Sequence, residues 1–430
     1  MERQKMKKRI AEKIAQERDA LICFLQTVIR ADTQVVGHGI TGGNEANGQK
    51  IIAAKLREMG CDPDIFEPDD VRLAKYGQGN QGHNYQNRPN VVGVFKGTGG
   101  GRSLILNGHV DTMPYGERAA WQMDPLGAEI KDGKLYGVGA ADMKAGLVAN
   151  LLAVEILQKL GIALKGDLIF QSVVDEEGGG NGTLACVERG YRADAAVVSE
   201  PTDLRIFPAH MGFIFYAVTV RGKSLHSSAK WLGVNAIEKA MLLMQALHEL
   251  EHRWLLTKKH PLLPGPTINV GEISGGTAGS TVPDQCQFKF CLHYLPTDSD
   301  RTGGGSLVEK EVLDALTAKC RGDEWLSGHP PEIVKYQEGS PFEIPSDHPL
   351  VQTAAAAYSQ VFASPAKVEG MLAGCDARHF ANLAGMPVIV FGPAEAAQAH
   401  STNEYVRIED YIQYIEVLCG LITDWCGVAE

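Results

Sequence analysis

The chain has 430 residues, of which 44% are hydrophobic and 22% are charged, and its formal net charge at pH 7 is −11. The composition is that of an ordinary globular protein, and the length corresponds to about two to three domain equivalents. The negative charge argues against nucleic acid or an anionic membrane as the main partner, but it leaves an anionic substrate open, because local Arg side chains and metal ions decide binding within a cleft.

The N-terminal residues 1–20 are rich in charge and predict a helix rather than a secretion signal. The apolar patch that follows, at 21–25, is too short for a secretory core and lacks a small-residue cleavage site. No segment approaches the ~20 apolar residues that a membrane helix needs. Nine scattered cysteines, an odd number without a Cys-x-x-Cys pair, favour reduced thiols. The sequence therefore predicts a cytoplasmic protein that does not enter a membrane.

From residue 90 to residue 201, apolar runs typical of strands alternate with loops and one strong helix at 144–160. This alternation predicts an α/β sheet with helical cover. Such sheets carry their chemistry at the carboxyl ends of the strands. Histidine and acidic side chains follow the turn at 137–141 and the apolar runs at 104–108, 168–174 and 195–199: His109, Asp111, Asp142, Glu176, Glu177 and Glu200. The sequence therefore predicts a carboxylate-rich metal site, suited to two ions.

Each of these residues has a simpler interpretation when it is taken alone. An adjacent pair such as Glu176 and Glu177 is usually a solvated turn, and Asp142 could cap the helix that follows it. A single histidine such as His400 is more often a surface or core residue than a ligand. The turn at 137–139 resembles the start of a dinucleotide fingerprint, but Asp142 stands where the third glycine should be, so nucleotide binding is rejected.

The order of predicted strands and helices changes from residue 213. Strand and helix patterns then follow in β-α-β-β-α order, at 213–220, 234–254, 267–273, 287–295 and 307–319. This order predicts a small two-layer domain with an antiparallel sheet. The α/β pattern resumes afterwards, at 349–362, 366–371, 376–384, 387–391 and from 408 onward. We therefore expect a catalytic domain split between 1–212 and 329–430, an inserted domain at 213–328, and the return of His400 to the first domain's site.

Five sequence blocks stand in the same order as in one known family, at 108–111, 137–146, 175–177, 199–202 and 399–404. In these blocks the chain resembles the co-catalytic zinc peptidases and deacylases that include acetylornithine deacetylase, succinyl-diaminopimelate desuccinylase, aminoacylase and carboxypeptidase G. The resemblance implies a mixed-sheet α/β catalytic domain with an inserted two-layer α+β lid, through which two subunits form a homodimer. It also implies two divalent metal ions, expected to be zinc, with cobalt or manganese as substitutes.

The resemblance assigns a role to each residue of the predicted site. It places one ion on His109, Asp142 and Glu200, and the other on Asp142, Glu177 and His400. Asp142 would bridge the two ions, and the Asp142–Met143 peptide bond would be cis. Asp111 would hold the second ring nitrogen of His109, because such partners fix the tautomer of a metal-binding histidine. Glu176 would remain free to act as the general base.

Three further residues concern the substrate. The block at 222–228 implies that His226 reaches the active site of a partner subunit and stabilises the scissile carbonyl oxygen; the alternative is a histidine that ends a lid strand. The block at 374–380 implies that Arg378 binds a substrate carboxylate, and the alternative is a structural ion pair. Gly392 would lie on a loop beside the substrate.

Departures from the family pattern narrow the range of expected substrates. Met211 and His293 stand where many relatives carry a cationic residue, and Ser280 stands where an asparagine is common. The loss of two cations argues against a second substrate carboxylate. The segment 209–212 resembles that of acetylornithine deacetylase-like members. We therefore expect hydrolysis of the amide bond of a small N-acyl amino acid. The alternatives are a dipeptidase or glutamate carboxypeptidase acting on a dipeptide, and a non-catalytic metal-binding relative.

Overall fold

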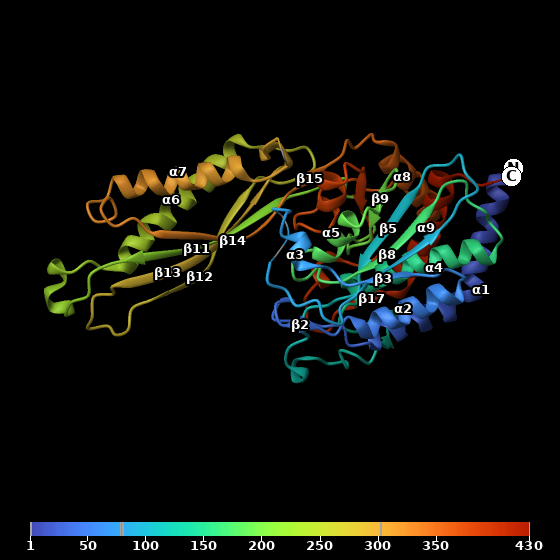
Figure 1. Cartoon of the computed structure of the whole chain (residues 1–430), viewed down its shortest axis with the longest axis horizontal. Helices are drawn as coiled ribbons and strands as arrows, with labels where there is room; N and C mark the ends of the chain where they lie inside the picture. Colours follow the sequence, from blue (N-terminus) through green and yellow to red (C-terminus); the bar gives the residue numbers. More distant parts are fainter. Residues whose placement is uncertain (1, 78, 80, 302, 430) are drawn as a thin grey trace. The chain divides into compact units, whose positions relative to one another are not determined.

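The computed structural model describes residues 2–77, 79, 81–301 and 303–429, and the chain divides into two compact units (Figure 1). Unit 1 comprises Met1–Pro208, Glu343–Gly370 and Cys375–Glu430, and unit 2 comprises Ala209–Phe342 and Met371–Gly374. The predicted boundaries lay at 212/213 and 328/329. The second boundary differs because strand β14 (Glu332–Gly339), which was not predicted, pairs with strand β11 (Gly212–Arg221) of unit 2.

Unit 1 contains a six-stranded mixed sheet in the order β16-β9-β5-β8-β4-β3. The strands are β3 (Asp64–Phe66), β4 (Asn90–Phe95), β5 (Leu104–His109), β8 (Leu168–Val173), β9 (Ala196–Val198) and β16 (Val388–Val390). Strands β16, β9, β5 and β8 run parallel, whereas β4 is antiparallel to β8 and β3. Every residue of β5 and β8 is buried. This matches their apolar sequences, because parallel strands are covered on both faces.

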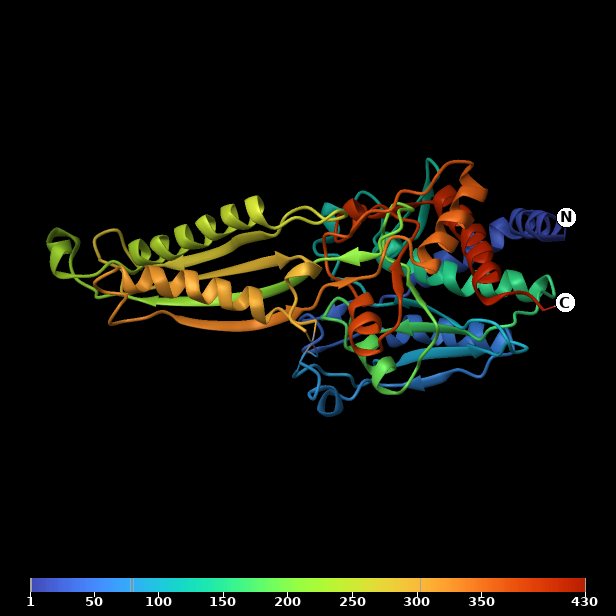
Figure 2. The same ribbon diagram turned by 90° about the horizontal axis from the view of Figure 1, so that it is seen from above.

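The helices of unit 1 pack around this sheet. They are α1 (Glu2–Arg30), α2 (Ala46–Glu58), α3 (Asp70–Leu73), α4 (Ala145–Lys159), α5 (Asn181–Glu188), α8 (Pro349–Phe362) and α9 (Ile408–Cys426). Helix α9 contacts α1, α4 and α8 (Figure 2). These helices share one apolar core with β5 and β8. Helix α1 runs past the predicted residue 20, because Leu21, Leu25 and Val28 are buried in that core. The helices of the described residues are all too short or too polar to cross a membrane.

Short elements complete unit 1. They include β1 (Val35–Val36), β2 (Gly42–Gly43), β6 (Glu129–Lys131), β7 (Lys134–Tyr136), β17 (Tyr405–Arg407), the single turns η2 (Ala140–Lys144) and η5 (His379–Leu383), and η6 (Ala396–Gln398). The helix expected at 376–384 is reduced to η5. The strand expected at 366–371 forms only isolated bridges, such as the one between Ile206 and Val368.

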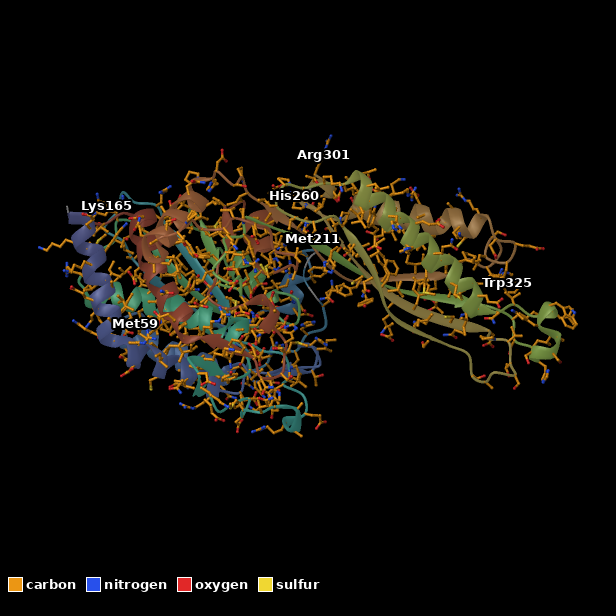
Figure 3. All side chains as sticks on the ribbon, turned by 180° about the vertical axis from the view of Figure 1, so that it is seen from behind. Met59, Lys165, Met211, His260, Arg301 and Trp325 are labelled. Atoms are coloured by element: carbon orange, nitrogen blue, oxygen red, sulfur yellow. The ribbon has the colours of Figure 1, made fainter. Side chains whose placement is uncertain are left out.

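Unit 2 is a two-layer α+β structure. Its antiparallel sheet has the order β12-β13-β11-β14, built from β11 (Gly212–Arg221), β12 (Thr267–Gly275), β13 (Gln285–Tyr294) and β14. Buried and half-buried residues alternate along β11 and β13, as expected for strands with one covered face. Helices α6 (Ala236–Thr257) and α7 (Ser306–Arg321) cover that face. Trp325 lies beyond α7 (Figure 3). Its ring stacks on that of His329, with the ring centroids 3.8 Å apart. The predicted fold class is confirmed.

Candidate metal centre

The predicted ligands lie where three neighbouring strands of unit 1 end. His109 is the last residue of β5, Glu176 and Glu177 follow β8, and Glu200 follows β9. Because β5 pairs in parallel with both β8 and β9, the carboxyl ends of these strands meet at one edge of the sheet (Figure 1). Asp142 comes from η2 and His400 from the loop after η6. The fold therefore brings together six residues from positions 109 to 400.

Asp142 stands between two groups of metal-binding side chains. Its Oδ1 lies 3.1 Å from His109 Nε2, and its Oδ2 lies 3.5 Å from His400 Nε2. Glu200 Oε2 is 3.8 Å from His109 Nε2 on the first side, and Glu177 Oε2 is 2.8 Å from His400 Nε2 on the second. Each oxygen of one carboxylate thus faces a different histidine, which is the geometry that a bridging ligand requires. The Asp142–Met143 peptide bond is cis, as predicted.

The donor set suits divalent cations. Imidazole nitrogens and carboxylate oxygens are ordinary zinc ligands, and a carboxylate-rich set also suits manganese. Among the described residues, Glu200 Oε1 is buried and has no hydrogen-bond partner, although a buried polar atom normally has one. His109, Glu176 and Glu200 form one cluster of possible ligand atoms, and Asp142, Glu177 and His400 form another. These residues form two adjacent groups of possible cation ligands.

Glu176 is the residue whose role geometry alone leaves open. Its Oε2 lies 4.0 Å from His109 Nε2, so distance would allow it to bind metal with His109 and Glu200. The resemblance makes it the general base instead. Burial raises the pKa of the Glu176 carboxyl well above its ordinary value, and the negative charge of Glu200 adds to the effect. A carboxylate with a raised pKa is a stronger base than an exposed one, which suits the predicted role.

Burial and neighbouring charges also set the pKa values of the other predicted ligands. The hydrogen bond that His400 donates to the Glu177 carboxylate raises the pKa of His400 to about 9, and burial raises the pKa of Glu200 to about 7. Burial also acts to raise the pKa of Asp142, but the hydrogen bond and charge of His109 and the charge of His400 together outweigh it and lower that pKa. Metal ligands must be deprotonated, so a bound cation would displace protons from His400 and Glu200.

Asp111 supports His109 in a different way from that predicted. The His109 Nδ1 atom lies 3.0 Å from the backbone carbonyl of Asp111 but 3.6 Å from its carboxylate Oδ1. The carbonyl therefore accepts the ring proton and fixes the tautomer. The Asp111 carboxylate instead accepts a hydrogen bond from the backbone N–H of Glu177, at 3.0 Å. It ties the loop of one predicted ligand to the strand end of another.

Glu404 is a buried residue of the site to which sequence analysis gave no role. Its carboxylate accepts hydrogen bonds from the backbone N–H groups of Gly139, Ala141 and Asp142, at 2.9, 2.7 and 2.9 Å. These contacts hold the turn that carries Asp142 against the loop that carries His400. The block at 399–404 already contained Glu404, but its partners lie more than 260 residues earlier, so its sequence position gave no sign of this role.

The residues predicted to bind substrate lie in three different settings. Arg378 is buried, with 2% of its surface exposed, and its guanidinium donates to the backbone carbonyls of Cys375 and Gly179 at 2.8 and 2.6 Å. These contacts bind the guanidinium to the backbone of unit 1. Gly392 packs against Glu200, whose carbonyl oxygen would lie 2.2 Å from any Cβ at that position. His226 is an exposed residue of unit 2, and its Nδ1 lies 2.7 Å from Ser228 Oγ.

A cleft of about 160 Å³ adjoins the site within unit 1. Asp142, Glu177 and His400 line it on one side. Its other walls combine apolar and aromatic residues (Met113, Pro114, Tyr115, Trp121 and Val138) with polar ones (Thr112, Ser401, Thr402 and Glu404) and Gly139. The site is therefore open to a small molecule whose scissile bond could meet the predicted metal ligands while an apolar part rests in the cleft.

Together these features define a centre for metal-assisted hydrolysis on an α/β sheet. Residues 105–424 match the sequence pattern of Peptidase family M20/M25/M40. The chain is 33% identical to N-formyl-4-amino-5-aminomethyl-2-methylpyrimidine deformylase of Halalkalibacterium halodurans over 97% of each chain. It is also 33% identical to acetylornithine deacetylase of Myxococcus xanthus, over 79% of this chain and 84% of that one. The chain belongs to Peptidase family M20/M25/M40.

Solved structures agree on the fold. The dipeptidase Dug1p of Saccharomyces cerevisiae matches with a TM-score of 0.74 at 15% identity, over 99% of each chain. The family M20 metallo-carboxypeptidase of Sulfolobus solfataricus matches with a TM-score of 0.73 at 18% identity, over 94% of this chain and 98% of that one. With its clustered ligands, the chain is a metal-dependent hydrolase of amide bonds, and the predicted resemblance is confirmed.

Proposed function

We propose that this enzyme removes a small acyl group, formyl or acetyl, from the nitrogen of a compact amine. The observation that carries this proposal is the match to the deformylase, which extends over 97% of both chains, whereas the match to the deacetylase covers 79% of this one. The first candidate substrate is accordingly a formylated aminomethylpyrimidine. An N-acetylated amino acid such as acetylornithine, the class predicted from the sequence, is the second candidate.

The residues of the site support this chemistry. His109, Asp142 and Glu200 would hold one divalent ion, and Asp142, Glu177 and His400 the other. When bound, the ions polarise the acyl carbonyl and lower the pKa of water. Glu176 takes the proton of the attacking water and returns it to the departing amine. The aromatic side chains of Tyr115 and Trp121 in the adjoining cleft suit a flat, uncharged ring beside the scissile bond.

The test is a panel of substrates offered to enzyme reconstituted with Zn²⁺, Co²⁺ or Mn²⁺. The panel contains the formylated aminomethylpyrimidine, N-acetylornithine, other formyl and acetyl amino acids, and dipeptides. We expect the highest kcat/KM for a formyl or acetyl amide, with formate or acetate released in equal amount to the amine. Metal-stripped enzyme is the control. Cleavage of dipeptides alone would overturn the proposal in favour of a peptidase.

The buried setting of Arg378 gives a prediction about substrate charge. Because its guanidinium already binds two backbone carbonyls, we expect Arg378→Ala to lower the melting temperature and to reduce kcat/KM for all substrates alike. The comparison is between acyl amines with and without an α-carboxylate. A rise in KM confined to substrates with that carboxylate would return Arg378 to the binding role that the resemblance implied.

We also propose that the enzyme is a homodimer through unit 2, in which His226 serves the partner's site. Strand β12 supports this arrangement, because it is an edge strand with most of its residues exposed. Mixing inactive Glu176→Gln subunits with inactive His226→Ala subunits should then restore activity. With random exchange, half the dimers are hybrids with one working site of two, so about a quarter of wild-type activity should return. Confirmed exchange without recovery would exclude action in trans.

A further inference from the structure

A fully buried group of charged side chains lies behind the pair Glu176 and Glu177. It consists of Glu45, Arg88 and Asp175, which we call the buried charge cluster, and none of the three side chains has exposed surface. Arg88 donates from Nε and Nη2 to Glu45 Oε1, at 2.8 and 2.5 Å, and from Nη2 to Asp175 Oδ1 at 2.8 Å. One guanidinium thus joins the segment before α2 to the residue that immediately precedes the two glutamates.

The Asp175 carboxylate is held from several sides. Besides Arg88, it accepts a hydrogen bond from the Tyr85 hydroxyl at 2.6 Å and lies 2.9 Å from His83 Nδ1. It also fills a narrow slot, because a Cβ at Gly39 or Gly178 would lie only 2.1 or 2.4 Å from its Oδ1. Both carboxylate oxygens are therefore engaged by neighbouring groups, and the side chain has little room to move.

The backbone turns at Asp175, immediately before the two glutamates. Its φ is +65°, in the left-handed region that residues other than glycine seldom adopt. Beyond this turn, Glu176 approaches His109 at 4.0 Å, whereas Glu177 approaches His400 at 2.8 Å. The two adjacent side chains therefore approach opposite halves of the centre directly after the residue whose carboxylate is anchored.

Burying the three charged side chains of the cluster costs solvation free energy, so their presence calls for an explanation. Replacing a buried ion pair with well-packed apolar side chains is often neutral or stabilising, so stability alone gives little reason for this arrangement. A planar fork that binds two carboxylates does, however, fix their separation and orientation. We propose that Arg88 and Asp175 are positioning residues, which direct Glu176 toward one half of the metal centre and Glu177 toward the other. This inference rests on the proposed roles of the two glutamates.

The experiment compares three variants with a matched control. Asp175→Asn keeps the shape of the side chain but removes its charge, Arg88→Lys keeps a charge but removes the fork, and Tyr85→Phe removes one hydrogen bond to Asp175. The control is Glu155→Gln, which disrupts another largely buried ion pair, between Glu155 and Lys55 at 2.7 Å, on helices α4 and α2. Each protein is loaded with Co²⁺, and its visible absorption spectrum, metal affinity, kcat, KM and melting temperature are measured.

We expect Asp175→Asn and Arg88→Lys to weaken binding of the second ion and to lower kcat by about 10–100-fold, the range typical of residues that orient metal ligands. KM should change little, and the cobalt spectrum should shift. Tyr85→Phe should give a smaller change in the same direction, and it keeps the inference testable if the charge variants fail to fold. Glu155→Gln should lower the melting temperature without altering the spectrum or kcat.

Different outcomes would count against the positioning role and against the proposed function. A wild-type cobalt spectrum, metal affinity and kcat in folded Asp175→Asn and Tyr85→Phe would overturn the positioning role. A lower melting temperature with all the other readouts unchanged would make the cluster purely structural and would overturn it equally. The spectrum and the metal affinity require no substrate, so wild-type enzyme that binds two ions but cleaves no acyl amide would refute the proposed function alone.

Discussion

Replacing Glu176 with glutamine should lower turnover by ~10²–10⁴-fold, the usual contribution of a positioned acid or base. Glutamine keeps the length of the side chain but cannot accept the proton of the attacking water. Burial and the neighbouring charge of Glu200 raise the pKa of the Glu176 carboxyl, which makes its carboxylate a stronger base than an exposed one. Metal content measured on the same preparation should remain that of the wild type, because the predicted role of Glu176 does not include binding a cation.

The neighbouring substitution, Glu177→Gln, is the matched control. It makes the same chemical change one residue further along, but Glu177 faces His400 at 2.8 Å and is a predicted ligand. It should therefore lower metal affinity as well as turnover. The comparison also resolves the one ambiguity of the geometry, since Glu176 lies within reach of the first cation site. Loss of metal from Glu176→Gln would identify it as a ligand, and near-normal turnover of the metal-loaded variant would remove the mechanism.

The fold class and the cluster of ligands were predictable because both depend on local sequence. An apolar run such as 104–108 identifies a buried strand, and a parallel strand delivers the residue that follows it to a known edge of the sheet. The structure brings His109, Asp142 and His400 together as the family blocks implied. Strand β14 was missed for the converse reason. Most of its residues are exposed or half-buried, so its sequence lacks the apolar pattern by which strands are recognised.

Contacts between distant residues could not be predicted from one sequence. Arg378 is the type of residue that commonly binds a carboxylate. Only the structure shows that its guanidinium donates to the backbone carbonyl of Gly179. Arg88 and Asp175 lie 87 residues apart, and no pattern near either one indicates the other. Residue types and spacing therefore identified which side chains could act, whereas their partners were set by tertiary packing.

Asp142→Asn should reduce the number of bound ions from two to one and abolish most activity. The reason lies in the two oxygens of Asp142, of which one faces His109 and the other His400, at 3.1 and 3.5 Å. Asparagine offers one oxygen and one amide group that donates hydrogen bonds, so it can serve only one half of the centre. It also removes the negative charge that offsets the repulsion between neighbouring cations.

Metal stoichiometry and affinity, measured by calorimetry at pH 6 and pH 8, would test this expectation. Wild-type binding should be tighter at pH 8 and should release protons, because the pKa values of His400 and Glu200 stand at about 9 and about 7 before metal binds. Asp111→Asn is the control, since Asp111 supports the loop of Glu177 without facing both histidines. It should weaken affinity about 10–100-fold yet still bind two ions at saturation. Two ions bound to Asp142→Asn with wild-type affinity would show that Asp142 is not the bridge.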